Sequence, residues 1–212
     1  MALITLASLF DRFDNCRICK KSGSSLQHIL GGGLTTHPKT ALVFINPTRQ
    51  NVSCDPKWNG PRFPFIGVTR FWKILADSGL ISKDFVLSGW DEGKARGLLS
   101  KLRRKKIYIT NLVKCTQNHG NYPEKKVFDY HLPLFFKEMD IIRPRAIIAF
   151  GALTTKYLTG RNIKMGEYFK RPEPLNYRNM KEIRVYPCYF PVGRGSPKLA
   201  TEVLRKLSFL LE

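Results

Sequence analysis

The sequence has no apolar run long enough to cross a membrane. A membrane-spanning helix needs roughly 20 consecutive apolar residues, and no stretch of this chain approaches that length. The first apolar stretch, residues 2–10, is short and has no basic segment before it. We interpret it as an amphipathic helix rather than a signal peptide, and we expect an intracellular protein that does not contact membranes.

Acidic residues are scarce. The chain has 16 Asp and Glu against 36 Lys and Arg, which gives a net charge of +20. Such an excess repels itself in a compact domain and favours an anionic partner, usually a polyanion. Aromatic residues stand among the basic ones, as in "KWNGPRFPF", "RFWK" and "YFKRPEPLNYR". That mixture suits a surface that holds phosphates and stacks on bases, although a compositional bias for solubility or heat resistance is the alternative.

Cysteine is also infrequent, with five residues in all. In a basic intracellular protein they do not indicate disulfides. Cys16 and Cys19 have the C-x-x-C spacing that lets two thiolates reach one metal centre, the alternative being a chance pair. Cys188 lies in an apolar run and indicates packing, and Cys54 has no assigned role.

Apolar, β-rich runs alternate with helical patterns along the chain. Strands are predicted at residues 41–46, 107–113, 146–150 and 183–190. Helices are predicted at residues 70–78, 91–102, 123–142, 152–157 and 197–211. Near-continuous apolar strands that alternate with helices are typical of a parallel sheet covered on both faces. We therefore predict a three-layer α/β/α fold with a central four-stranded, mainly parallel sheet.

With 212 residues and 43% hydrophobic residues, the chain fits one domain with a real core. We expect residues 40–212 to form that core. Residues 1–39 supply the N-terminal helix, the cysteine pair and a connection at 22–39 that we expect to be flexible. Ligands of open parallel sheets bind outside the carboxyl ends of the strands, which directs attention to the residues from Asn46, Asn111, Gly151 and Phe190 onward.

Four motifs resemble those of the uracil-DNA glycosylase superfamily. "FINP" followed by "FPFIGVTRFWKILADSGL" resembles the mismatch-specific uracil/thymine-DNA glycosylases. "YITNLVKCTQNHGNYP" and "IIRPRAIIAFGALTTKYL" are similar to the iron–sulfur, family 4 uracil-DNA glycosylases. The terminal "YFPVGRGSPK" occupies the position of the superfamily's last motif. The motifs occur in the correct order over most of residues 41–212, so the chain looks like a hybrid of the two branches.

Two residues depart from the family 4 pattern. Ile45 replaces its acidic residue and is followed by Asn46, and Phe190 stands where many members have a histidine. Both departures match the mismatch-specific branch.

The resemblance implies a pocket for a base that has been flipped out of DNA. Phe65 would stack on the base, and Asn111 would read its edge through one donor and one acceptor. Asn46 would orient the attacking water, because an amide cannot act as a general base. Ile45 and Phe190 would complete the substrate site. The alternatives are a core aromatic for Phe65, a turn cap for Asn111 and a turn-forming Asn-Pro for Asn46.

The last motif implies the DNA-binding loop. Its residues are Gly193, Arg194, Gly195, Ser196 and Lys198. The glycines permit close approach of the backbone, and the basic side chains supply charge. An ordinary glycine-rich surface turn is the alternative.

The family resemblance also implies a metal centre. Cys115 falls at the ligand cysteine of the V-K-C motif, and His131 stands where the family has its fourth ligand. With Cys16 and Cys19 they would hold a structural [4Fe–4S] cluster, since imidazole can replace a thiolate on iron. Zinc suits the same four residues and is the alternative.

We therefore expect a monomeric, monofunctional uracil-DNA glycosylase. Two other functions stay open. One is a glycosylase for another base, such as thymine in T·G or hypoxanthine, and the other is a metal-containing nucleic-acid-binding protein without catalysis.

Overall fold

The computed structural model describes residues 5–18, 26–118, 122–178, 180–193 and 195–210. Its centre is a sheet with the strand order β1-β3-β2-β4-β6-β5. The four inner strands run parallel and are β3 (Ile107–Asn111), β2 (Thr40–Phe44), β4 (Ala146–Phe150) and β6 (Met180–Cys188). Two short antiparallel strands lie at the edges, β1 (Gly32–Gly33) and β5 (Leu175–Tyr177). The predicted parallel sheet of four strands is confirmed, with two edge strands added.

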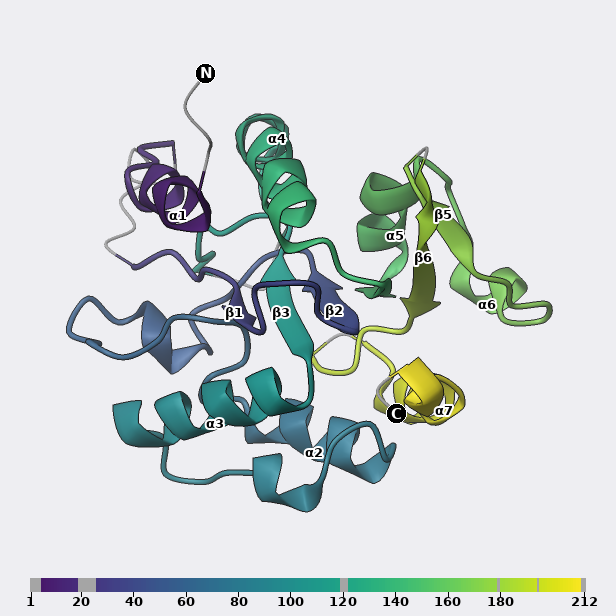
Figure 1. The fold of residues 1–212 in the computed structure, drawn as a ribbon, viewed down its shortest axis with the longest axis horizontal. Helices are drawn as coiled ribbons and strands as arrows, with labels where there is room; N and C mark the ends of the chain where they lie inside the picture. The colour runs from purple at the N-terminus through teal and green to yellow at the C-terminus, as the bar shows by residue number, and fades with distance from the viewer. Residues whose placement is uncertain (1–4, 19–25, 119–121, 179, 194, 211–212) are drawn as a thin grey trace.

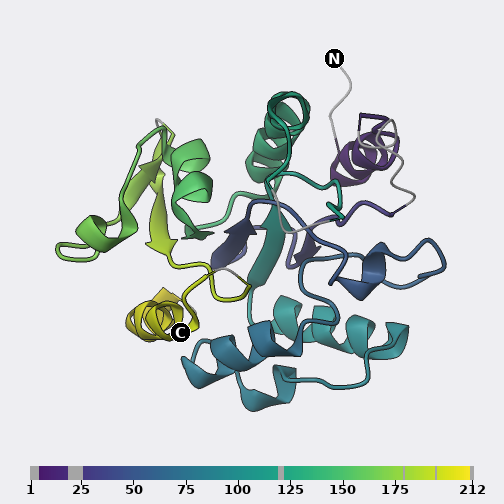
Figure 2. The same ribbon diagram turned by 180° about the vertical axis from the view of Figure 1, so that it is seen from behind.

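Helices cover both faces of the sheet, as Figures 1 and 2 show from opposite sides. Alternate residues of β2 enter different cores, with Ala41 and Val43 on one face and Leu42 and Phe44 on the other. The first core is closed by α4 (Lys125–Ile142) and α5 (Ala152–Thr159). The second is closed by α2 (Thr69–Asp77), α3 (Glu92–Arg104) and α7 (Pro197–Lys206). The three-layer prediction is therefore confirmed.

The predicted N-terminal amphipathic helix is present as α1 (Leu6–Asp14), which begins at a capping box between Thr5 and Ser8. Its apolar face, carried by Leu9 and Phe13, packs against the side chains of Leu30 and Leu134. α1 thus forms an additional element beside α4 (Figure 1).

The flexible connection predicted at residues 22–39 is wrong for its described part, residues 26–39. Ile29 is fully buried, and its N–H donates to the carbonyl of Lys114 at 2.9 Å. Farther along, β1 pairs with β3. Backbone groups that find partners in this way are held in place, so this segment is part of the body of the fold. Residues 22–25 lie outside the described residues.

Several short elements were not predicted from the sequence. They are α6 (Met165–Tyr168) and the 3₁₀ turns η2 (Val52–Cys54) and η3 (Lys83–Phe85), whereas the helix predicted at residues 197–211 is divided into α7 and the 3₁₀ turn η4 (Ser208–Leu210). Segments of three or four residues carry too little periodicity to be recognised. Among the described residues, no helix is long and apolar enough to cross a membrane.

Candidate functional site

An aromatic cluster lies where the parallel strands end. The ring of Phe44, the last residue of β2, stacks on Phe150 with a centroid distance of 4.3 Å. It forms T-shaped pairs with Phe65 and Phe190, at centroid distances of 4.6 and 6.2 Å. Phe44 and Phe150 are buried, whereas Phe65 and Phe190 are only partly buried. The two aromatic residues predicted to bind substrate thus both contact the buried ring of Phe44.

The backbone of Phe65 is in an uncommon conformation. Its φ of 67° lies in the left-handed region, which bulky residues rarely occupy. The indole N–H of the buried Trp72 donates to the carbonyl of Phe65 at 2.9 Å, so helix α2 holds this conformation. Such strain costs on the order of 1–3 kcal/mol and gathers at functional sites, which favours a functional role for the Phe65 ring.

Asn111, the last residue of β3, pairs with Phe44 across the parallel ladder and is 1% exposed. Its Nδ2 is buried and has no hydrogen-bond partner in the described part of the chain. A buried donor without a partner costs about 1–3 kcal/mol. A bound ligand with an acceptor at this point would remove that cost.

Asn46 and Ile45 lie on the loop that follows β2 and have different surroundings. The Nδ2 group of the half-buried Asn46 donates to the carbonyl of Pro47 at 3.1 Å, which leaves its Oδ1 as the group that can accept from water. The side chain of Ile45 is buried in the cluster that contains Cys16 and Cys115. The structure therefore places the Ile45 side chain beside the predicted ligands Cys16 and Cys115, and not in the aromatic cluster.

The last motif forms a tight loop before α7. The N–H of Ser196 donates to the carbonyl of Phe190 at 2.9 Å. A Cβ atom at Gly195 would lie 1.8 Å from the same carbonyl oxygen, so the loop itself requires glycine there. Gly193 has a φ of 61° and is exposed, as is Lys198 in the first turn of α7. Arg194 lies outside the described residues.

Three of the four predicted metal ligands converge. One ligand atom from each of Cys16, Cys115 and His131 lies within 4.8 Å of the others, and all three residues are buried. The distance from Cys115 Sγ to His131 Nε2 is 3.1 Å. Cys19 lies outside the described residues. The structure thus brings together the C-terminal end of α1, the segment after β3 and the first half of α4.

The surroundings of His131 keep its imidazole neutral. Burial, followed by the nearby charges of His28 and Lys114, lowers the pKa of His131 to about 3. The ring is held flat against Phe13, with a centroid distance of 5.4 Å and an angle of 8° between the planes. Neutral imidazole is the form that binds metals, and two cysteine sulfur atoms lie beside it.

Cys115 is in a disulfide in this structure, contrary to the expectation of no disulfides, and as a reduced thiolate it would fit zinc or an iron–sulfur cluster together with Cys16 and His131. The residues present therefore fit a metal centre.

The metal-ligand group is connected to the loop that carries Phe65. Asp14, two residues before Cys16, accepts two hydrogen bonds from the guanidinium of Arg62, at 2.9 and 2.5 Å. Gln27 donates through Nε2 to the carbonyls of Asp55 and Trp58, at 2.6 and 3.1 Å. A metal bound at this group would therefore also help to hold the segment that leads to the aromatic cluster.

We expect Cys115→Ala to remove most of the bound metal and to lower the melting temperature, because a metal centre adds its binding free energy to folding. Cys188→Ala is the matched control, since it removes another buried sulfur, in β6. It should cost stability but leave the metal content at the wild-type value. Elemental analysis and thermal unfolding measure both quantities, and equal metal content in the two variants would contradict the assignment.

Sequence reasoning missed a buried ion pair next to this site. Lys114 Nζ lies 2.6 Å from Glu138 Oε2, and both side chains are 0% exposed. The signals were a lysine inside "NLVKC" and a glutamate on the apolar face of the helical pattern at 123–142. Either residue alone reads as a solvent-exposed charge, because Lys and Glu are almost never fully buried unless paired.

A cavity of about 360 Å³ lies elsewhere, between α6, β6 and α7. Tyr168, Phe169, Tyr186, Tyr189 and Phe209 contribute its aromatic lining. None of the predicted site residues lines it, so we do not assign the cavity to this site.

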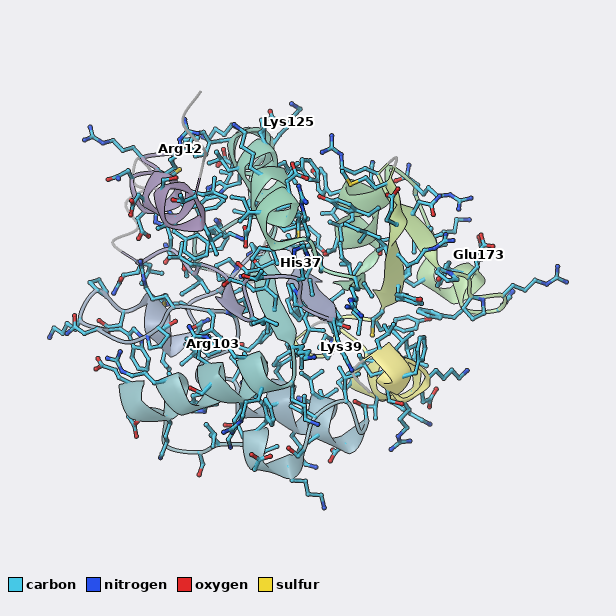
Figure 3. The ribbon with its side chains drawn as sticks, in the orientation of Figure 1. Arg12, His37, Lys39, Arg103, Lys125 and Glu173 are labelled. Carbon is cyan, nitrogen blue, oxygen red and sulfur yellow. The ribbon has the colours of Figure 1, made fainter. Side chains whose placement is uncertain are left out.

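Positive charge covers both outer layers of the molecule. Figure 3 labels Arg12 on α1, Lys125 on α4 and Arg103 on α3, and all three side chains are exposed. Exposed basic side chains therefore occur on helices of both outer layers and are not confined to one helix, which suits long-range attraction of a polyanion.

Comparisons with known proteins agree with the motifs. A family model described as "Uracil DNA glycosylase superfamily" matches residues 33–207. Proteins named "Type-4 uracil-DNA glycosylase" from Sulfurisphaera tokodaii and Saccharolobus solfataricus are each 33% identical, over 98 and 95 residues. These alignments cover 43% of this chain and 43% and 44% of the relatives. A protein of the same name from Pyrobaculum aerophilum is 37% identical over 62 residues, 28% of this chain and 32% of the relative.

The chain thus aligns with less than half the length of these curated relatives. The family model, in contrast, extends from β1 to the end of α7 and includes the aromatic cluster, Asn46, Asn111 and the last loop. The chain belongs to the uracil-DNA glycosylase superfamily.

Proposed function

We propose that this protein excises uracil from DNA by hydrolysing the bond between the base and deoxyribose, which leaves an abasic site. The observation that carries the proposal is the buried, unpaired Nδ2 of Asn111 beside the aromatic cluster. Uracil presents an acceptor at O4 and a donor at N3–H, and one amide side chain matches both. Cytosine presents the reverse pattern and would leave buried groups unpaired, at about 1–3 kcal/mol each.

Phe65 stacks on the flipped base in this proposal. Its constrained backbone, fixed by Trp72, supports a ring that is pre-positioned for the base. Phe190 supplies a second aromatic wall. Ile45 supports the loop after β2 by packing against Cys16 and Cys115. A pre-formed pocket loses little freedom when the base enters it.

Asn46 positions the water. The water oxygen bonds to C1′ of the sugar while the bond from C1′ to the base breaks. The electron pair of the broken bond leaves with the base. The water loses a proton to solvent, and uracil departs as an anion stabilised by backbone N–H groups and the positive field. Since an amide takes up no proton, the rate depends strongly on how good the leaving group is.

The amide of Asn51, on the same loop, is not free to take over this task. Asn51 Oδ1 already accepts from the N–H and the hydroxyl of Ser53, at 3.0 and 2.7 Å. Its Nδ2 donates to the carbonyl of Phe63 at 2.7 Å. Asn51 therefore holds the loop together, and Asn46 is the better candidate for contact with water.

The loop with Gly193, Arg194, Gly195, Ser196 and Lys198 holds the DNA strand next to the extruded base. Phosphate contacts from backbone N–H groups and basic side chains set the position of the protein but carry no sequence information. The base must leave the duplex before it can reach Asn111, so we expect the loop to act when the strand is distorted.

Cys16, Cys19, Cys115 and His131 hold a [4Fe–4S] cluster in this proposal, with zinc as the alternative. When bound, the metal centre supplies a cross-link between α1, the segment after β3 and α4, and no step of the hydrolysis needs it. A brown protein that absorbs visible light indicates iron–sulfur, and a colourless protein with one zinc per chain indicates zinc.

The test is an excision assay on oligonucleotides that contain one uracil, in single strands and in U·G and U·A pairs. Alkali should cut the product, and without alkali the strand should stay intact if the enzyme is monofunctional. T·G and hypoxanthine substrates test the other glycosylase activities. Binding without cleavage of any substrate would favour a nucleic-acid-binding protein and would overturn the proposal. We further propose that the protein is monomeric and acts inside the cell, where its DNA substrate is.

We expect Asn111→Asp to reduce uracil excision by 100-fold or more, because losing one well-placed group costs on the order of 10²–10³ in rate. A carboxylate cannot donate to O4, and it repels the developing base anion. It can accept from the amino group of cytosine, so weak cytosine excision is expected. Asn162→Asp makes the same change on an exposed residue and should leave excision unchanged. A variant at Asn111 with wild-type selectivity would show that another group reads the base.

A further inference from the structure

A fully buried lysine lies directly behind Asn111. Lys114 and Glu138 form their ion pair with no exposed side-chain area. Removing two charges from water costs several kcal/mol per ion, and a well-packed apolar pair of similar volume is often as stable or more stable. Stability alone therefore does not account for charges at this position.

The Lys114 ammonium group donates two hydrogen bonds, to the backbone carbonyl of Asn111 at 2.6 Å and to Thr110 Oγ1. Its charge is balanced by Glu138 Oε2, which lies 2.6 Å away as the partner of an ion pair. The cation also lies 5.2 and 5.4 Å from the ring centroids of Phe13 and Phe135. The Lys114 side chain is therefore fixed on every side.

Glu138 completes the network with its other oxygen. Oε1 accepts from the hydroxyls of Tyr108 and Thr110, both at 2.7 Å. The backbone of Gly31 packs directly against these groups. A Cβ atom at this position would lie 1.8 Å from the Tyr108 hydroxyl oxygen and 2.8 Å from Glu138 Oε1, so there is no room for a side chain. Glu138 Oε2 makes no hydrogen bond and is compensated by the Lys114 charge alone, while the remaining buried hydrogen bonds hold both side chains in place.

Lys114 also joins this network to the metal ligands. Its backbone nitrogen lies 3.4 Å from Nδ1 of His131, and its carbonyl accepts from the N–H of Ile29 at 2.9 Å. The next residue is Cys115. One residue therefore contacts the backbone of the proposed base reader through its side chain and the metal-ligand group through its main chain.

We propose that Lys114 is a positioning residue that fixes the direction of the Asn111 side chain and so sets the choice of base. The inference rests on the proposed role of Asn111 as base reader. The peptide between residues 111 and 112 is held at both ends, because its carbonyl accepts from Lys114 and its N–H donates to Phe44 O at 2.8 Å. Without the ammonium group, this peptide can rotate and move Nδ2 away from O4.

The test compares two variants that differ only at position 114. Glu138→Gln keeps the Lys114 contact with the Asn111 carbonyl, and Lys114→Met with Glu138→Gln removes it without leaving an unpaired buried carboxylate. We expect the single variant to keep the ratio of uracil to cytosine excision. The double variant should excise uracil about tenfold more slowly in a single turnover, the rate equivalent of one hydrogen bond. Its ratio of uracil to cytosine excision should decrease.

A second measurement does not depend on activity. In protein labelled with ¹⁵N-asparagine, the side-chain amide signals of Asn111 are identified by their loss in Asn111→Asp. We expect one sharp pair of signals in wild type and Glu138→Gln, and shifted or broadened signals in the double variant. Glu138→Gln leaves the Lys114 ammonium without its counter-charge and is expected to be less stable, so all variants are compared at a temperature at which their unfolding curves show them folded.

The outcomes are separable. Suppose that the wild type excises uracil and that the double variant has the same rate, the same ratio of uracil to cytosine excision and the same amide signals. This result would overturn the positioning role of Lys114 and leave the proposed function intact. If the wild type excises no uracil, the proposed function fails, and the amide signals still decide whether Lys114 orders Asn111.

Discussion

Asn46→Ala is expected to slow single-turnover excision of uracil by roughly 10²- to 10⁴-fold, the usual loss for one well-placed catalytic group. Binding of uracil-containing DNA should remain nearly unchanged, because in the proposed mechanism Phe65 and Asn111 hold the base. The physical reason is the geometry of the amide. Its Nδ2 is engaged by the Pro47 carbonyl, which leaves Oδ1 to hold the water against the sugar.

Gln50→Ala is the matched control, since Gln50 is an exposed amide on the same loop. It should retain the wild-type rate within a factor of about two, because a surface side chain away from the reacting atoms contributes little. If Asn46→Ala reacts as fast as wild type and Gln50→Ala is slow, Gln50 holds the water. Rapid quench of excess enzyme with labelled oligonucleotide measures the chemical step, and equilibrium binding measures affinity.

The second large effect concerns stability. We expect Glu138→Leu to lower the free energy of unfolding by about 3–5 kcal/mol, because it leaves the Lys114 ammonium buried without a counter-charge. The hydroxyls of Tyr108 and Thr110 lose their acceptor as well. For a chain of this length, the change corresponds to a drop of roughly 6–20 °C in melting temperature.

Combining Glu138→Leu with Lys114→Met should restore most of that loss, since apolar replacement of a complete buried pair is often neutral or stabilising. The two single variants and the double variant form a thermodynamic cycle, measured by urea unfolding. Additive losses in the cycle would mean that the two charges do not interact in the folded protein. Recovery of stability without recovery of base selectivity would separate the structural role of the pair from the positioning role of Lys114.

The sequence by itself predicted the parallel core. Uninterrupted apolar runs at the four inner strands can be stable only if both faces of each strand are covered, so the pattern determines the three layers. The edges were missed for the opposite reason. Strand β1 is two glycines and β5 has three residues, and such short segments form strands only because a neighbouring strand offers free backbone groups.

The motifs also singled out Asn46, Asn111, Phe65 and the two cysteines of the described segments as candidates, because residue type and spacing are local properties. Orientation is not local. The left-handed backbone of Phe65 depends on an indole seven residues away, and Ile45 turns toward the sulfur ligands because its neighbours there are apolar.

Only the tertiary structure decided what Lys114 and Glu138 do. In the sequence each is a charged residue that hydration would hold at the surface, and nothing local indicates burial. Packing of α4 and α1 against the sheet removes water from both, after which each charge can be satisfied only by the other and by fixed dipoles. The sequence determined which residues are candidates for the chemistry, and long-range packing determined how each of them is held.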